Sequence, residues 1–200
     1  MTERRRVVIS GYGAVTPLGA NAETFWQGLV AGRSGVRSIS TFDASRVTSR
    51  IAGEVPDFDP SVVLDRKEIR RNDRTTQMAL VVTRAAMEMA NLPGRLDETD
   101  ALHTAVVIGS GLGGTGTLID QIGVNATRGP DRLSPFFIPM AIGNMAAGQV
   151  AISFNAKGPN FSTASTKPSR PESNGRLAPA GSSLRVESAR IAAKPPTVAS

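Results

Sequence analysis

Residues 109–114 read GSGLGG and directly follow the apolar run TAVVI at 104–108. Glycines spaced as GxGxxG behind a strand can hold a dinucleotide pyrophosphate at a helix N-terminus. That fold also needs a second strand ending in Asp or Glu about twenty residues later. Here this region reads RGPDRLSPFF, a proline-broken loop in which Asp131 ends no strand. We therefore predict that these glycines serve a tight turn and close backbone packing, with nucleotide binding as the alternative.

A second candidate is the charged run DRKEIRR at 65–71. If it is helical, Lys67, Arg70 and Arg71 lie at i, i+3 and i+4 on one face, and Glu68 points elsewhere. Such a cationic stripe could bind a phosphate group or an acidic partner protein. The alternative is a solvated helix face without a partner.

The residue types that are missing exclude several chemistries. The 200 residues contain no cysteine and one histidine, His103. No disulfide, thiolate metal site or cysteine nucleophile is possible without a thiol. His103 has no second histidine to form a metal site or a catalytic triad with, so we predict a surface residue, no metal and no cofactor.

Composition limits the partners and the compartment. No apolar run approaches the roughly 20 residues that cross a membrane. The start MTERRRVVIS lacks the apolar stretch of a signal peptide, so we expect a cytoplasmic protein. The net charge is +6, but residues 167–200 hold six basic residues against Glu172 and Glu187. The excess of positive charge therefore belongs largely to residues 167–200. We predict neither a nucleic-acid nor a membrane partner.

Apolar patterning predicts strands that alternate with helices, which favours an α/β fold with a largely parallel sheet. The predicted strands are 5–10, 104–108 and 160–165, with a short strand at 51–55. The predicted helices are 22–32 behind an Asn21 cap, 72–91, 117–128 and 137–154.

From Thr166 the apolar pattern stops. Residues 167–200 contain five prolines and no aromatic residue, a composition typical of disorder. The predicted organisation is therefore a domain over residues 1–165 and a disordered C-terminal tail over 166–200.

Several segments together resemble the N-terminal part of β-ketoacyl-acyl-carrier-protein synthase II, the elongating condensing enzyme of fatty-acid synthesis. The landmarks stand in the family's order and spacing over residues 4–165: RRVVISGYGAVTPLG, FWQGLVAGRSGV, RKEIRRND, VVIGSGLGG, SPFFIPMAIGNMAAGQVAI and AKGPNFSTAS. The resemblance implies the N-terminal portion of a thiolase-like fold with an incomplete sheet, because three of the five strands in the family's half-domain sheet are present. The first strand would lose a neighbour and become an exposed apolar edge, so we expect marginal stability.

The resemblance also implies a nucleophile that this chain lacks. In the family, the strand that matches NFSTAS leads to a cysteine at the start of a buried helix, where the helix dipole lowers the thiol pKa. Two histidines and a lysine from the enzyme's second half assist malonyl decarboxylation. Lys167 stands at the cysteine position, and its amine is largely protonated at neutral pH. We therefore predict a truncated, inactive synthase.

Other family positions are retained. Leu112 matches the gate of the acyl-chain pocket, and Phe137 and Ile138 lie near the part of that pocket to which the family's homodimer partner contributes. Lys67, Arg70 and Arg71 match the basic residues that meet acyl carrier protein. The alternative function is a non-catalytic module for carrier-protein binding or dimerisation.

Overall fold

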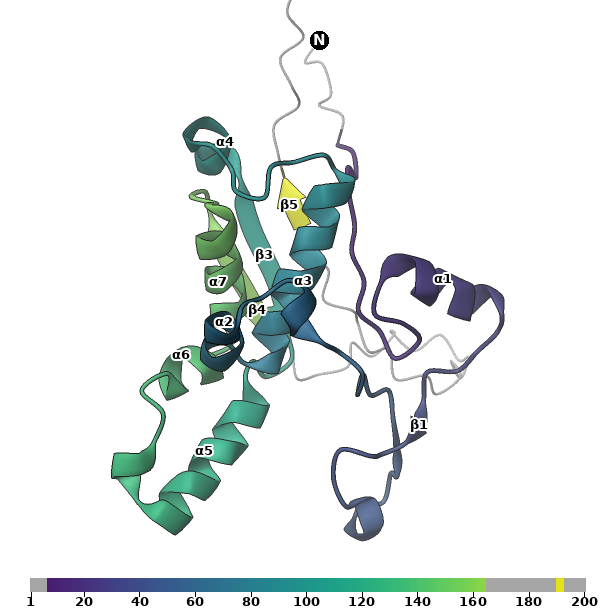
Figure 1. Cartoon of the computed structure of the whole chain (residues 1–200), viewed down its shortest axis with the longest axis vertical. Coiled ribbons are helices and arrows are strands. Elements are labelled where there is room, and N and C mark those ends of the chain that lie inside the picture. The colour runs from purple at the N-terminus through teal and green to yellow at the C-terminus, as the bar shows by residue number, and fades with distance from the viewer. Residues whose placement is uncertain (1–6, 165–189, 193–200) are drawn as a thin grey trace, which may run out of the picture.

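The computed structural model describes residues 7–164 and 190–192. Its elements form a three-stranded sheet covered by helices, a separate two-stranded hairpin, and a projecting helical arm (Figure 1). The predicted α/β class with an incomplete sheet is confirmed.

The three-stranded sheet has the order β4-β3-β5. Its central strand β3 (Ala105–Ser110) pairs in parallel with β4 (Asn160–Ala164) and antiparallel with β5 (Arg190–Ala192). Side chains alternate along β3, so that Val106 and Ile108 are buried while Val107 between them is 41% exposed. One face of the sheet therefore carries the core.

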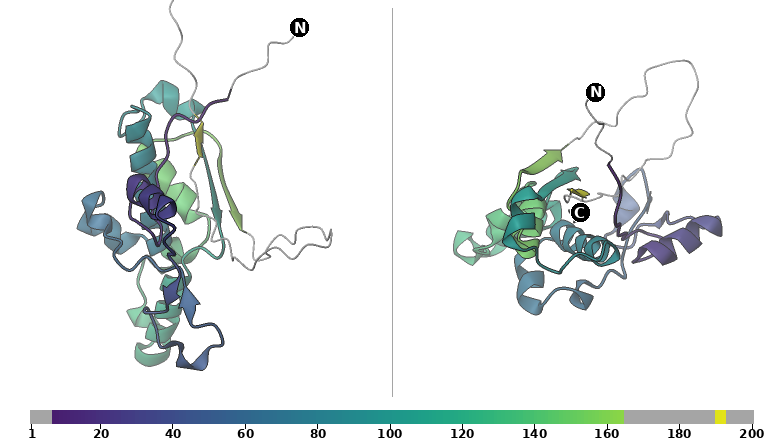
Figure 2. Two further views of the ribbon diagram at one scale, coloured as in Figure 1. Left: turned by 90° about the vertical axis from the view of Figure 1, so that its right-hand side faces the viewer. Right: turned by 90° about the horizontal axis from the view of Figure 1, so that it is seen from above.

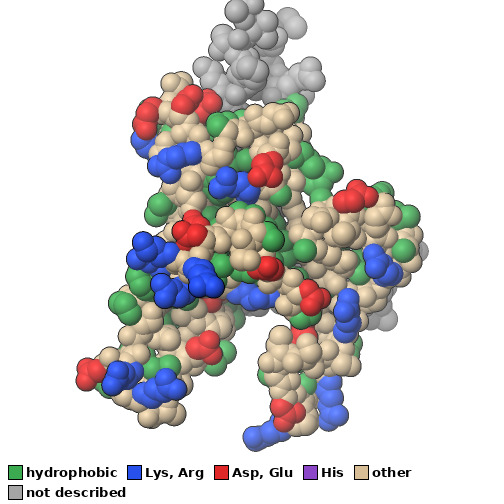
Figure 3. All heavy atoms as spheres, in the orientation of Figure 1, with side chains coloured by type: hydrophobic (Ala, Val, Ile, Leu, Met, Phe, Trp, Pro, Cys, Tyr) green, Lys and Arg blue, Asp and Glu red, His purple; other side chains and the backbone are tan. Residues whose placement is uncertain are grey.

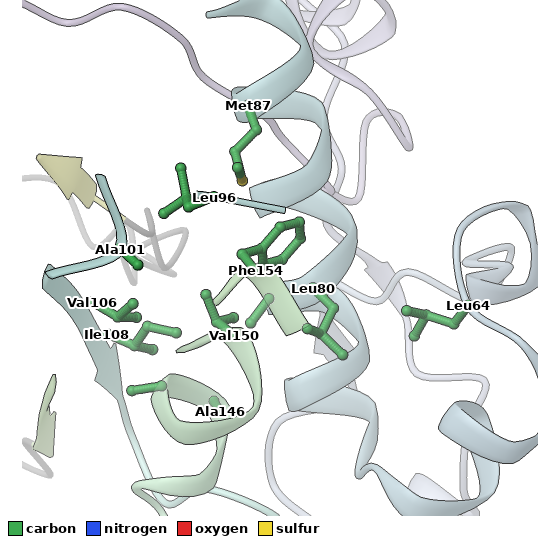
Figure 4. Close-up of a cluster of buried hydrophobic side chains, with 12 residues drawn as sticks. Leu64, Leu80, Met87, Leu96, Ala101, Val106, Ile108, Ala146, Val150 and Phe154 are labelled. Carbon is green, nitrogen blue, oxygen red and sulfur yellow. The ribbon is translucent and has the colours of Figure 1, made fainter. Parts of the chain in front are cut away.

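That face is covered by α3 (Arg74–Met89) and α7 (Met145–Phe154). Both helices lie on the same side of the sheet (Figure 2). In Figure 4, Leu80 and Met87 of α3 point toward Val150 and Phe154 of α7. These side chains and those of β3 form one continuous hydrophobic core, whose burial is the main source of stability in a domain of this kind.

The amino-terminal part lies beside this core. It contains α1 (Ala22–Val30), the hairpin of β1 (Arg37–Ser38) with β2 (Ile51–Ala52), and the 3-10 turns η1 (Ala44–Arg46) and η2 (Pro60–Val62). The predicted cap is confirmed, because Asn21 Oδ1 accepts a hydrogen bond from Thr24 N at 2.9 Å.

The remaining helices are α2 (Arg66–Arg71), α4 (Glu98–His103), α5 (Thr115–Arg128), η3 (Pro130–Arg132) and α6 (Phe137–Ala141). α5, η3 and α6 form the arm that projects from the sheet in Figure 1. None of the helices in the described ranges is both long and apolar enough to cross a membrane.

Two predictions of secondary structure were wrong. Residues 7–10 of the predicted first strand have no ladder partner, while residues 5 and 6 lie outside the described residues. The predicted helix 137–154 is two helices, because Ile142 takes an extended conformation (φ −72°, ψ 139°) ahead of Gly143. A continuous apolar pattern does not show such a break.

Residues 166–200 are predicted to be disordered, but residues 190–192 of this tail form β5. Ile191 is a β-branched residue, and such residues favour a strand where an edge such as that of β3 is free to pair. The remainder of the predicted tail lies outside the described residues, and so does Lys167.

Candidate functional site

The candidate carrier-docking residues lie on α2, a helix fixed at its start by its own acidic side chains. Asp65 Oδ1 accepts hydrogen bonds from the N–H groups of Glu68 and Lys67, both at 2.7 Å. Glu68 Oε2 in turn accepts from Asp65 N at 2.8 Å, which completes a capping box. These two N–H groups, with the charges of Lys67 and Arg71, lower the pKa of Asp65. Residues 66–71 are thus helical, which is the condition for placing Lys67, Arg70 and Arg71 on one face.

The other end of α2 is also satisfied. Gln77 Nε2 donates to the carbonyl oxygens of Asn72 at 2.8 Å and Ile69 at 3.0 Å. Ile69 packs against the hydrophobic core next to buried Leu64. α2 is therefore anchored by Ile69 and by its caps.

Lys67, Arg70 and Arg71 are all exposed. None of them forms an ion pair with an acidic residue of the described part of the chain, where the one salt bridge joins Lys157 to Glu98. Figure 3 shows Lys and Arg side chains gathered over the region of α2. The structure thus presents these three residues as an exposed cationic face.

This cationic face lies next to the segment that begins α6. The Arg71 guanidinium stacks over the Phe136 ring, 4.9 Å from its centroid. Phe136 directly precedes Phe137 and Ile138, the first two residues of α6. The structure therefore places one candidate docking residue, Arg71, beside the segment that carries two of the candidate acyl-pocket residues, Phe137 and Ile138.

The loop 109–114 contacts the other end of α6. Gly114 N donates to Ala141 O at 3.2 Å, and a Cβ on Gly114 would lie 1.9 Å from Met140 O. Gly113 has a φ of +69°, which favours glycine. These contacts support the prediction of a tight turn and close packing at Gly113 and Gly114, whereas a Cβ on Gly111 would meet nothing within 4 Å.

The candidate acyl-pocket residues are largely open to solvent. Leu112 is 69% exposed and Ile138 is 58% exposed, whereas Phe137 is half-buried. Two hollows, of about 250 Å³ and about 280 Å³, are lined by none of the predicted site residues. The described residues therefore do not enclose Leu112 or Ile138.

His103 ends α4 and is exposed, as predicted, with its Nδ1 2.8 Å from Thr99 O. Within residues 7–164 and 190–192, no group of three or more His, Cys, Asp or Glu residues could hold a metal ion. Lys167, which the resemblance is expected to place at the family's nucleophile position, lies three residues after β4 and outside the described residues.

Sequence reasoning missed the residues that hold this region together. Asp73 is buried between α3 and α5, where its carboxylate accepts a hydrogen bond from Thr117 Oγ1 at 2.7 Å. Phe136 was also missed as a partner of Arg71. The signal for Asp73 was its position at a helix start, which predicts a cap but not a second bond to a distant helix.

Comparison with known proteins gives matches over most of the chain. Residues 4–169 match the family model described as the N-terminal domain of beta-ketoacyl synthase. The 3-oxoacyl-[acyl-carrier-protein] synthase 2 of Coxiella burnetii is 49% identical over 160 residues, which are 80% of this chain and 38% of that protein. The synthase of the same name from Synechocystis is 46% identical over 161 residues, again 80% and 38% of the two chains. The chain thus spans well under half the length of these relatives.

Solved structures show the same fold. The ishigamide ketosynthase/chain length factor superposes with a TM-score of 0.69 at 26% identity, over 81% of this chain and 40% of that one. A beta-ketoacyl synthase from Burkholderia phymatum gives a TM-score of 0.63 at 25% identity, over 80% and 39%. The ketosynthase AntDE in complex with the acyl-carrier protein AntF gives 0.58 at 19% identity, over 79% and 42%.

Proposed function

Because the chain belongs to the β-ketoacyl synthase family and matches its N-terminal domain, we propose that it is the amino-terminal portion of a 3-oxoacyl-acyl-carrier-protein synthase that binds carrier protein without catalysing condensation. The parent reaction joins an acyl-enzyme thioester to a malonyl unit that loses carbon dioxide. The matched relatives bear the name of that enzyme.

The composition of the chain supports inactivity. The parent reaction needs a thiol to carry the acyl group and two histidines to assist decarboxylation, and these 200 residues contain no cysteine and one histidine. His103 is on the surface and bonds to a backbone carbonyl. Purified chain given acyl-carrier and malonyl-carrier substrates is expected to form no 3-oxoacyl product by mass spectrometry. A product at a rate above that of a heat-treated sample would overturn inactivity.

The observation that carries the binding proposal is the exposed cationic face of α2. Its acidic residues, Asp65 and Glu68, are engaged in the helix cap, so Lys67, Arg70 and Arg71 remain available to an acidic surface. The related fold AntDE is known in complex with an acyl-carrier protein. An acidic carrier protein is the partner that these charges fit.

Fluorescence anisotropy with labelled acyl carrier protein tests this binding. The full chain is expected to bind, and Lys67→Glu with Arg70→Glu is expected to weaken binding at least tenfold, since complementary charge becomes repulsive. A matched control, Arg128→Glu with Arg132→Glu, makes the same change of net charge at exposed positions on the arm. Equal loss in both double variants, or no binding by the unmodified chain, would overturn the proposal.

Dimerisation is a second candidate because α5 carries an exposed apolar stripe. Leu118, Ile119 and Ile122 are 41%, 64% and 58% exposed and lie within about one turn of each other. Apolar surface of this kind often marks an interface between proteins. Light scattering should then report a dimer that Ile119→Glu with Ile122→Glu converts to monomer, whereas a monomer before substitution would exclude this candidate.

A further inference from the structure

One edge of β3 is only partly occupied. On one side, β4 pairs with β3 from Val106 to Ser110. On the other side, β5 pairs with Ala105, Val106 and Val107 alone. Among the described residues, nothing pairs with Ile108–Ser110 on that second side. A strand edge with unpaired N–H and C=O groups is a template for another strand.

A second segment of the chain is suited to this edge. Val7, Val8 and Ile9 are β-branched or apolar strand formers, and they are 95%, 71% and 89% exposed. Their sequence pattern predicts a strand, yet they have no ladder partner. In Figures 1 and 2, β5 lies between β3 and this amino-terminal segment.

The residues that follow fix the direction in which this segment runs. A Cβ on Gly11 would lie 2.0 Å from Ala86 O, and a Cβ on Gly13 would lie 2.4 Å from Val82 O. Gly11 thus contacts a later residue of α3 than Gly13 does, so the amino-terminal segment and α3 run in opposite directions.

β3 also runs opposite to α3. The segment after its C-terminal end contacts the start of α3, where Thr75 Oγ1 donates to Gly113 O at 3.4 Å. The chain that leaves the end of α3 returns through α4 to the start of β3. Residues 7–13 and β3 therefore run in the same direction.

We propose that residues 7–9 and residues 190–192 compete for one edge of β3. When β5 is paired, the edge holds an antiparallel strand and the amino-terminal run is exposed. When β5 leaves, residues 7–9 form a parallel strand on the same edge. The two states exclude each other because residues 7–9 precede the contact of Gly11 with Ala86 near the end of α3, and so lie level with the start of β3, the part of the edge that β5 occupies.

The absence of native cysteine allows a direct test by disulfide trapping in the full chain. Val107 pairs with Arg190 in the β5 register, and its side chain lies on the face away from the core. Val107→Cys with Arg190→Cys traps the β5 state, since paired strand positions lie within disulfide reach. Three further double variants combine Val107→Cys with Val7→Cys, Val8→Cys or Ile9→Cys. They test for the state in which residues 7–9 pair with β3.

Ile191→Pro is then added to the scanning pairs to remove β5, because proline cannot take part in a ladder. Disulfide formation between Val107→Cys and at least one amino-terminal position is expected to rise several-fold. Ser182→Pro, outside β5, is the matched control and should leave the yield unchanged. No rise for any of the three pairs, or an equal rise with Ser182→Pro, would overturn the proposal.

A second measurement needs no proline. In the Val107→Cys, Arg190→Cys chain, hydrogen exchange at residues 7–9 is compared between the oxidised and the reduced form. Closing the disulfide holds β5 in place, so exchange at residues 7–9 should become faster than in the reduced form. Identical exchange in the two forms would show that the segments do not compete.

Discussion

Asp73 and Thr117 connect the start of α3 to the start of α5. Thr117 Oγ1 donates to Asp73 Oδ2 at 2.7 Å, and Thr117 N donates to the same oxygen at 3.3 Å. The other oxygen of Asp73 caps α3 by accepting from Thr75 N at 2.9 Å. Both residues are buried. One carboxylate thus joins the start of α3, which follows α2 in the chain, to the start of α5, which follows the 109–114 loop.

Replacing this carboxylate should loosen both helix starts. Asp73→Ala removes a cap and leaves buried donors of Thr117 without a partner, which together should cost about 1–3 kcal/mol. Thr117→Val should cost less free energy of unfolding than Asp73→Ala. In this variant no hydroxyl donor is left unpaired, and Asp73 keeps its bonds to the backbone N–H groups of residues 75 and 117. Hydrogen exchange at residues 115–118 measures the effect. Asp59→Ala, which removes an exposed cap from η2, is the control and should leave that exchange unaltered; no change with Asp73→Ala would contradict the prediction.

Local signals predicted the elements that depend on neighbouring residues. The cap at Asn21 and the helical spacing of the α3 apolar residues are both properties of short stretches, and the structure has these two helices. The cationic face of α2 followed from the same spacing rule. Leu112 and Ile138 were predicted as acyl-pocket residues from the family resemblance alone. The residues next to them in the sequence carry no signal for their exposure to solvent.

Predictions that depend on distant partners were less successful. The β-branched run at 7–10 has strand propensity, but a strand also requires a free edge, and β5 occupies part of the edge at β3. The contacts of Arg71 with Phe136 and of Asp73 with Thr117 join residues separated by many positions. No local pattern encodes these pairs, because they arise from how helices pack.

The close approach of the 109–114 loop to α6 predicts contrasting effects of two glycine substitutions. Gly114→Ala would place a Cβ 1.9 Å from Met140 O, so backbone must move, and a loss of about 1–3 kcal/mol is expected. Gly123→Ala, in the middle of α5, meets nothing within 4 Å. Alanine is the better helix former there and should stabilise α5 by up to about 1 kcal/mol.

Urea titration followed by far-ultraviolet circular dichroism compares the two variants. The midpoint should fall for Gly114→Ala and stay level or rise for Gly123→Ala. Equal midpoints would show that the loop can withdraw from α6 without cost, contrary to the packing described.

Glu54 predicts an acid-sensitive contact between the β2 end and the loop after β1. Hydrogen bonds from the hydroxyl groups of Thr41 (2.6 Å) and Ser40 (2.7 Å) lower its pKa from 4.5 to about 2. A carboxyl whose pKa is lowered by folding contributes stability above pH 4.5, and this contribution is lost as the pH falls toward 2. The hairpin contact should therefore persist at pH 4 and be lost near pH 2.

Nuclear magnetic resonance of the Ser40 and Thr41 amides follows this transition, since both N–H groups also donate to the Glu54 carboxylate. Their shifts should titrate together with a midpoint near pH 2. Glu54→Gln should abolish the shared inflection while leaving amides on α3 unaltered. A midpoint near the ordinary glutamate pKa would show that these bonds are not maintained in solution.

A thiol in place of Lys167, where the family resemblance is expected to place the nucleophile, should not produce condensation activity. Lys167→Cys supplies a sulfur atom, but condensation also requires histidines that assist decarboxylation, and His103 is the single histidine in the sequence. The residues after Lys167 read PSRPESNG and lack a helical pattern, so no helix dipole is expected to lower the thiol pKa from about 8.5. Iodoacetamide labelling against pH measures that pKa. Ser169→Cys provides a matched thiol two residues further on, and the two should react alike, with no 3-oxoacyl product from either chain. A thiol at 167 that reacts many-fold faster at neutral pH than one at 169 would contradict this prediction, because it would show that the surroundings of position 167 lower the thiol pKa.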